Sequence, residues 1–278
     1  MPQTINTNLS SLNAQRNVAS SQSTLQTTMQ RLSSGLRVNS AKDDAAGLAI
    51  AERMNAQVRG MNVAIRNAND GVSLAQTAEG AIGKIGDALQ RMRELAVQSA
   101  NGTNNSGDRD NLQTEFSQLR AEITRLVSGT SFNGQNILDG SNPTFTFQVG
   151  ANNLTTDQID VDLADLTTTV GTPTAALDIS GADNTGALAA MDALDDALDS
   201  VTTARANYGA VQNRFETVVG NLMVTSENLT AARARIMDAD FAVETSNLSR
   251  TQILQQAGTA MVAQANQQPN AVMALLRG

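Results

Sequence analysis

The sequence predicts a mainly α protein: a long antiparallel, coiled-coil-like helical rod, with a small β-hairpin in the middle of the chain and paired terminal helices. Two long segments, residues 54–96 and 190–236, repeat apolar residues every seven positions. This spacing places the apolar residues on one stripe of a helix. Aromatic residues make up only 3% of the chain, and Trp is absent. Thin helical packing therefore fits the composition better than a thick globular core.

Residues 190–236 carry the longest apolar stripe, at alternating steps of four and three, which only Thr225 interrupts. The stripe consists of Ala190, Leu194, Ala197, Val201, Ala204, Tyr208, Val211, Phe215, Val218, Leu222, Leu229, Ala232 and Ile236. A strict seven-residue period on an α-helix produces a left-handed supercoiled seam, here about 70 Å long. Such a helix needs partners along its whole length, from its own chain and from other copies.

The N-terminal segment, residues 1–36, has only a narrow stripe of apolar residues: Ile5, Leu9, Leu12, Leu25, Met29, Leu32 and Leu36. Ordering each residue costs on the order of 1–2 kcal/mol of backbone entropy. So little apolar surface cannot offset that cost, and we expect the segment to be disordered in a free monomer.

Two further helices are expected before the middle of the chain. The first follows a capping-box-like start at Ser40 and Asp43 and ends near Gly102, and the second is capped by Asp108 and ends at Gly129. Next come turn residues 132–135, a β-hairpin at about 144–163 and an exposed loop at about 164–185. The acidic residues around 157–165 lack the Gly and Glu of a calcium-binding EF-hand loop, which favours a solvated acidic face.

The C-terminal helix should begin at Phe241, after a break at residues 237–240. Its apolar stripe is also thin: Leu248, Leu254, Met261, Val272, Leu275 and Leu276. Both ends of the chain therefore suit helices that pair with each other and with neighbouring molecules, so these two stripes are the predicted self-assembly residues.

The composition excludes several function classes. The chain has no Cys and no His, which removes disulfides, His or Cys metal sites and Ser-His-Asp triads. A net charge of −8 argues against binding nucleic acid. We expect no enzymatic activity, catalytic residue, cofactor or metal, and no membrane partner, because no segment reaches transmembrane length. The first 15 residues contain no cleavable signal peptide.

Several motifs resemble those of bacterial flagellin, the subunit of the flagellar filament. They are LSSGLRVNSAKDDAAGL at 32–48, LQRMRELAVQSAN at 89–101, SFNG at 131–134, RIMDADFA at 235–242 and QANQ at 264–267. The resemblance covers both ends of the chain and identifies a short form without large central domains. It implies an inner region formed by residues 1–42 and 237–278, which builds the filament core, and an outer region formed by residues 43–236.

The resemblance also implies a structural motility protein. It would be exported through the flagellar type III apparatus without a cleaved signal, and would self-assemble outside the cell by coupled folding of its terminal helices. Its partners would be copies of itself, an export chaperone at the C-terminal segment, and the filament cap and hook-filament junction proteins. A further implied partner is the vertebrate innate receptor Toll-like receptor 5, whose contacts map onto Gln90, Arg91, Leu95 and Glu115. The helical pattern itself predicts Gln90 and Arg91 outward and Leu95 partly exposed.

Two alternative functions are compatible with parts of the sequence. A hook-filament junction protein would share similar termini, although the complete motif at 89–101 favours a filament subunit. A secreted enzyme or effector is a remote alternative, which a cleft with convergent polar groups would support.

Overall fold

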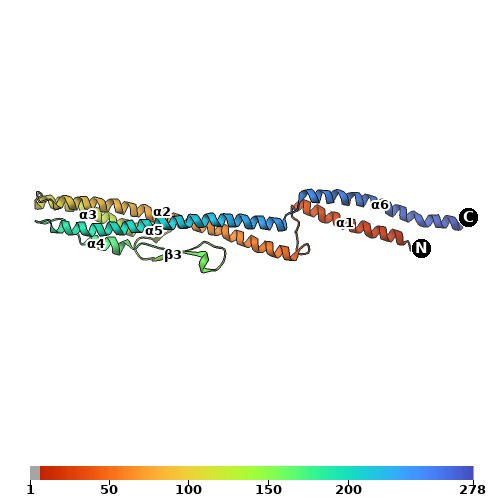
Figure 1. The fold of residues 1–278 in the computed structure, drawn as a ribbon, viewed down its shortest axis with the longest axis horizontal. Helices are drawn as coiled ribbons and strands as arrows, with labels where there is room; N and C mark the ends of the chain where they lie inside the picture. Colours follow the sequence, from red (N-terminus) through yellow and green to blue (C-terminus); the bar gives the residue numbers. More distant parts are fainter. Residues whose placement is uncertain (1–6, 278) are drawn as a thin grey trace. The chain divides into compact units, whose positions relative to one another are not determined.

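A computed structural model describes the backbone of residues 7–277 and the side chains of residues 7–267 (Figure 1). Its α-helices are α1 (Leu9–Ser34), α2 (Ala45–Ala100), α3 (Ser106–Gly129), α4 (Thr172–Ala175), α5 (Thr185–Met237) and α6 (Phe241–Arg277). Its strands are β1 (Ser131–Phe132), β2 (Gln135–Asn136), β3 (Thr144–Gln148) and β4 (Gln158–Asp162). The predicted mainly α fold with a small hairpin is confirmed.

The chain forms two compact units. The first contains residues 1–56 and 228–278, and the second contains residues 57–227. Both are built from segments far apart in the sequence, as the coiled-coil pattern requires. The predicted inner and outer regions, divided near residues 42 and 237, remain a prediction about the assembled state.

In the second unit, α2 and α5 run antiparallel. Gly71 faces Phe215, Gly86 faces Val201, and Arg93 bonds to Asp195. As the residue number rises along α2, the number of its partner on α5 falls by almost the same amount. This is the pattern of two antiparallel helices in one fixed register. The predicted seam residues from Ala190 to Phe215 line this contact, and α3 adds Phe116, Ile123 and Val127 to the same core.

Full burial of the α5 stripe ends at Phe215. Up to that point the hairpin segment also covers α5: the rings of Phe147 and Phe215 meet edge to face, with centroids 5.4 Å apart, and the Ala164 amide donates to the Tyr208 hydroxyl. Farther along, Leu222 is only half-buried and Met223 is 54% exposed. The predicted stripe is therefore a closed core over only part of its length.

The helix starts correct two expectations. Asp44, not Ser40, caps α2, because its carboxylate accepts a hydrogen bond from the Gly47 amide at 2.8 Å. Asp43 instead accepts from the Asn39 and Ser40 amides and closes the preceding turn. Asn105 caps α3, and Asp108 is its reciprocal partner three residues later in a capping box.

Near the start of α3, Arg109 is buried although it is charged. Its Nε donates to the Ser99 carbonyl at 3.1 Å, and its Nη1 donates to the Gly181 carbonyl at 3.3 Å. A buried charged group needs such hydrogen bonds to offset its lost hydration. Arg109 therefore ties the end of α2 to the segment that precedes α5.

The middle of the chain forms two antiparallel hairpins. Asn133 and Gly134, with φ of 50° and 77°, form the two-residue turn between β1 and β2, and positive φ at both positions is the requirement of a type I′ turn. Strand β3 pairs with β4, from Thr144 opposite Asp162 to Gln148 opposite Gln158. The predicted turn and hairpin are confirmed.

The expected exposed loop at about 164–185 is partly wrong. It contains a π-helical turn (Thr167–Gly171) and α4, and it buries Val170 and Ile179 in the core.

The acidic residues of this region make local hydrogen bonds. The Asp165 carboxylate accepts from the Thr168 hydroxyl, which lowers the pKa of Asp165 below its usual value. Within the described residues, no group of three or more acidic side chains is arranged to hold a metal ion.

Replacing Phe215 with Ala should destabilise the second unit strongly, because the ring is fully buried between Gly71 and Phe147. We expect a loss of about 3–5 kcal/mol in the free energy of unfolding, measured by urea denaturation. Met223→Ala is the matched control, since this side chain is exposed on the same helix and its loss should cost under about 0.5 kcal/mol. Equal effects of the two substitutions would contradict the assigned core.

Candidate functional site

The first unit pairs α1 with α6 in antiparallel order. The Asn8 side chain donates to the Ala265 carbonyl at 2.6 Å, and Arg31 lies 3.9 Å from Glu244 at the other end of the pair. Gly258 allows close approach midway, because a Cβ atom there would lie 2.6 Å from a methyl group of Val18. Gly35 ends α1 in the left-handed conformation, and its carbonyl accepts from the Ala239 amide.

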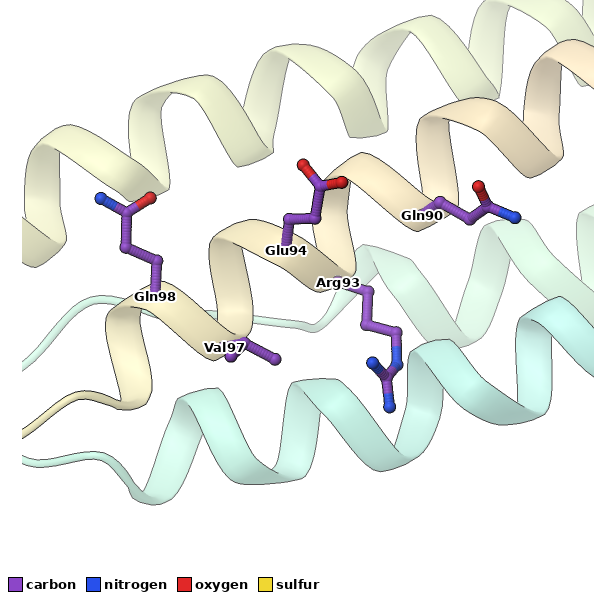
Figure 2. Close-up of a pocket in the computed structure, with 5 residues that line it drawn as sticks. All are labelled: Gln90, Arg93, Glu94, Val97 and Gln98. Atoms are coloured by element: carbon purple, nitrogen blue, oxygen red, sulfur yellow. The ribbon is translucent and has the colours of Figure 1, made fainter.

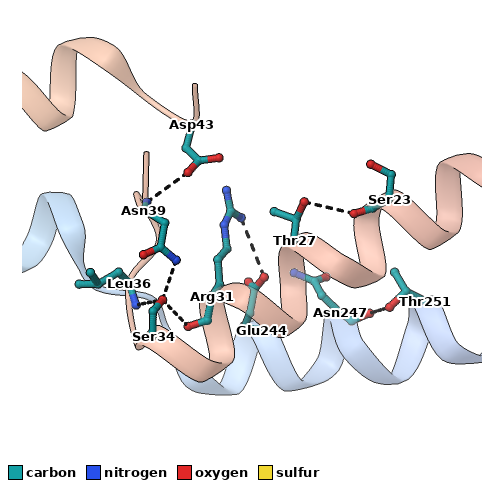
Figure 3. Close-up of polar contacts among 10 residues, drawn as sticks. All are labelled: Ser23, Thr27, Arg31, Ser34, Leu36, Asn39, Asp43, Glu244, Asn247 and Thr251. Atoms are coloured by element: carbon teal, nitrogen blue, oxygen red, sulfur yellow. Dashed lines mark hydrogen bonds and ion pairs between the residues drawn. The ribbon is translucent and has the colours of Figure 1, made fainter. Parts of the chain in front are cut away.

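Polar side chains occupy the interior of this helix pair. The buried residues among the described parts of α1 and α6 are Ser11, Thr28, Glu244 and Thr251. Figure 3 shows the Arg31–Glu244 ion pair and the Thr251 hydroxyl bonded one turn back, to the Asn247 carbonyl. No apolar residue of these described parts is fully buried, so the two helices gain less hydrophobic free energy from each other than the core of the second unit does.

Many large apolar side chains of the pair face outward instead. Eight of them are between 50% and 68% exposed: Leu9, Leu12, Met29, Phe241, Val243, Ile253, Leu254 and Met261. An isolated soluble protein rarely leaves so many apolar side chains uncovered on two neighbouring helices. These eight exposed residues of α1 and α6, here together called the outer apolar face, are the first candidate functional site.

The structure separates the predicted self-assembly residues into two groups. Leu9, Leu12, Met29, Leu254 and Met261 lie on the outer apolar face, whereas Leu25, Leu32, Leu36 and Leu248 are half-buried. Ile5 and the side chains of Val272, Leu275 and Leu276 lie outside the described residues. The stripe predicted for the C-terminal helix did not include Phe241, Val243 and Ile253, because these residues do not follow its helical spacing. Counting every apolar residue of α6, rather than one stripe, would have found them.

A second candidate site lies on α2 and α3 of the second unit. Gln90 and Arg91 are exposed, as predicted. The Arg91 Nη1 donates to Glu94 at 2.8 Å and its Nε donates to Glu115 at 2.9 Å, so the structure brings Arg91 and Glu115 together. These hydrogen bonds, chiefly the one to Glu94 and then the one to Glu115, raise the pKa of Arg91.

The expected partial exposure of Leu95 is wrong, because only 1% of this residue is exposed. The prediction assumed one partner helix, but this part of α2 packs against both α5 and α3. Two partners widen the buried face of a helix beyond a single stripe.

A shallow hollow lies along α2 beside Arg91. It is formed by Gln90, Arg93, Glu94, Val97 and Gln98 (Figure 2). Arg93 points across to α5, where its guanidinium bonds Asp195 and lowers the pKa of that carboxylate. Val97 is 49% exposed, so this surface combines charge with an accessible apolar side chain.

None of the described helices is both long enough and apolar enough to cross a membrane.

Comparison with known proteins gives two family matches. The bacterial flagellin N-terminal helical region matches residues 5–143, and the bacterial flagellin C-terminal helical region matches residues 191–276.

Whole-length relatives agree with these matches. A flagellin from Halalkalibacterium halodurans is 50% identical over 98% of this chain and 99% of the relative, and one from Bacillus subtilis is 43% identical over the same shares. The crystal structure of Bacillus cereus flagellin, at 32% identity, covers 60% of this chain and 94% of its own with a TM-score of 0.51. A putative flagellar hook-associated protein from Vibrio parahaemolyticus has a TM-score of 0.61 at 16% identity, a likeness of fold alone. The chain therefore belongs to the bacterial flagellin family, the structural subunits of the flagellar filament.

Proposed function

We propose that this flagellin assembles by covering the outer apolar face of α1 and α6 with the same helices of neighbouring copies. The main observation behind this proposal is that the fully buried residues described in the pair are polar, whereas eight large apolar side chains are at least 50% exposed. Where such contacts join different surfaces of successive copies, they produce an open filament if the rotation between copies does not close.

The energetics favour folding that is coupled to assembly. Covering one exposed Leu, Ile, Met or Phe completely contributes about 1.5–3 kcal/mol. The α1–α6 pair lacks this contribution as long as its apolar residues stay in water. Neighbouring copies supply it, and it then offsets the conformational entropy of ordering the two helices.

Amide hydrogen exchange should therefore be fast in residues 9–34 and 241–267 of the monomer and slow in residues 74–96, which belong to the closed core. In assembled filaments, exchange of the terminal helices should slow by several orders of magnitude. Strong protection of α1 and α6 in the monomer would contradict coupled folding.

Replacing Ile253 with Asp should stop assembly, because the charge would have to be buried against a neighbouring copy at a cost of several kcal/mol. The monomer should stay folded, since Ile253 is 66% exposed. Gln252→Asp is the matched control, because it adds the same charge at the adjacent exposed position. Seeded elongation followed by light scattering, with circular dichroism of the monomer, measures both effects. Normal filaments from Ile253→Asp would refute the role of this face.

We further propose a route to the filament. Export through the flagellar type III apparatus, without a cleaved signal, would release the chain outside the cell. Before export, a dedicated chaperone at the C-terminal segment would cover the apolar residues of α6. The filament cap and the hook-filament junction proteins would contact the subunits at the two filament ends. The hook-filament junction role remains the less favoured alternative for this chain, and growth of long filaments by the purified protein separates the two.

We also propose Toll-like receptor 5 as a partner of the monomer, at Gln90, Arg91 and Glu115. Arg91 and Glu115 form one exposed charged cluster across α2 and α3, and the exposed Val97 lies nearby on α2. Arginine beside accessible apolar surface is typical of binding hot spots. Leu95 no longer belongs to this set, because its side chain lies in the core.

Arg91→Ala should weaken binding of the monomer to the receptor ectodomain by about tenfold, a typical loss for an interface hot spot. The fold should be unchanged, since exposed ion pairs contribute little to stability. Arg125→Ala is the matched control, because this exposed arginine of α3 pairs with Glu122 and does not line the hollow beside Arg91. Surface plasmon resonance would measure both variants, and equal affinities of Arg91→Ala and the unmodified protein would discard the assignment.

A further inference from the structure

Charge is unevenly distributed along the first unit. The residues of α1 and α6 between 8 and 34 and between 245 and 267 include three arginines, Arg16, Arg31 and Arg250, and no acidic residue. The segments where α1 ends and α6 begins, residues 36–44 and 238–244, carry five carboxylates and two cations and are here called the negative end. The paired helical stretches are therefore positive, and the negative end is net negative.

A polar groove of about 400 Å³ lies between α1 and α6 within the positive part. Hydroxyl groups of Thr24, Thr28 and Thr251 line it together with Asn247, Arg31 and Arg250. Only one acidic residue, Glu244, reaches it. Figure 3 shows how Arg31, Glu244, Asn247 and Thr251 meet from the two helices.

The two arginines of the groove lack full pairing. The Nε of Arg31 is buried without a hydrogen-bond partner, and its Nη1 lies 3.9 Å from Glu244, the outer limit of an ion pair. Arg250 is exposed, and no carboxylate of the described residues lies within 4 Å of it. A buried guanidinium donor without an acceptor is costly, so the groove suits an added carboxylate.

The negative end offers one free carboxylate among the described residues. Asp43 closes a turn, Asp44 caps α2, and Asp240 accepts from the Ala242 amide at the start of α6. Asp238 is exposed, and its carboxylate makes no hydrogen bond or ion pair within the described part of the chain. Asp238 does not line its own groove. From Phe241, the first residue of α6, to Arg250 the helix rises about 14 Å, so Arg250 lies well beyond Asp238 along the chain.

We propose that Asp238 of one subunit docks into the polar groove of a neighbouring subunit, between Arg31 and Arg250. This inference rests on the proposed assembly and adds a specific contact to it. The apolar face supplies non-directional attraction, whereas a carboxylate between two guanidinium groups fixes how far neighbouring helix pairs slide past each other. Each subunit gives one carboxylate and receives another, so the contact repeats along an open filament.

Charge exchange tests the contact. Arg250→Glu and Asp238→Arg should each slow seeded elongation roughly tenfold or more, because each places like charges together. The double variant should recover to within about threefold of the unmodified protein. Arg16→Glu is the matched control: it makes the same charge change on an exposed residue of the same helix pair, outside the groove, and should elongate normally.

Three results would overturn the proposal: a double variant as slow as the single variants, an effect of Arg250→Glu without one of Asp238→Arg, or equal slowing by Arg16→Glu. Circular dichroism of each monomer excludes misfolding as the cause. If the charge variants elongate normally while Ile253→Asp does not, the groove contact fails and the apolar assembly stands. If the unmodified protein forms no filaments, the proposed function itself fails.

Discussion

The contact between α2 and α5 is the interaction on which the second unit depends. Alanines and glycines along this seam let the two helices approach closely, and the larger residues of each helix fill the space beside them. At Gly71 the absence of a side chain admits the ring of Phe215, since a Cβ atom there would lie 2.6 Å from it. The hairpin segment and α3 pack against this helix pair in the same core.

The two units follow opposite packing rules although both are antiparallel helix pairs. In the second unit the apolar residues face inward and close a core that the monomer can complete alone. In the first unit Ser11, Thr28 and Thr251 face inward, and Ile253 and Leu254 face water. Polar contacts between two exposed helices exchange for contacts with water at little net gain. In the proposed assembly, the first unit would take from neighbours the stability that the second unit has from its own core.

Sequence periodicity predicted α2 and α5, because a seven-residue repeat over many turns is characteristic of long packed helices. The turn at residues 133–134 was also predictable, since few residues accept positive φ at both positions. The caps were misplaced because Ser, Asp and Asn cluster before both helices, and only the backbone geometry selects Asp44 and Asn105. Features that depend on a third element could not be read from one helix: Leu95 is buried because α3 returns along α2. A thin stripe on α1 or α6 is likewise compatible with facing either the other helix or solvent, and only the pairing distinguishes the two.

A polar interior in the terminal pair also has a physical advantage for a protein that must stay soluble before it polymerises. If α1 and α6 bound each other through Leu, Ile and Met, the monomer would complete this unit alone, and neighbours would find no apolar surface to cover. Ser, Thr and Asn at the contact keep the pairing weak and leave the apolar surface available. They also provide fixed hydrogen-bonding positions, such as Asn8 with Ala265 and Ser11 with Asn266, that define one register between the helices. Weak but registered pairing lets each incoming chain order its ends in the geometry that the next copy requires.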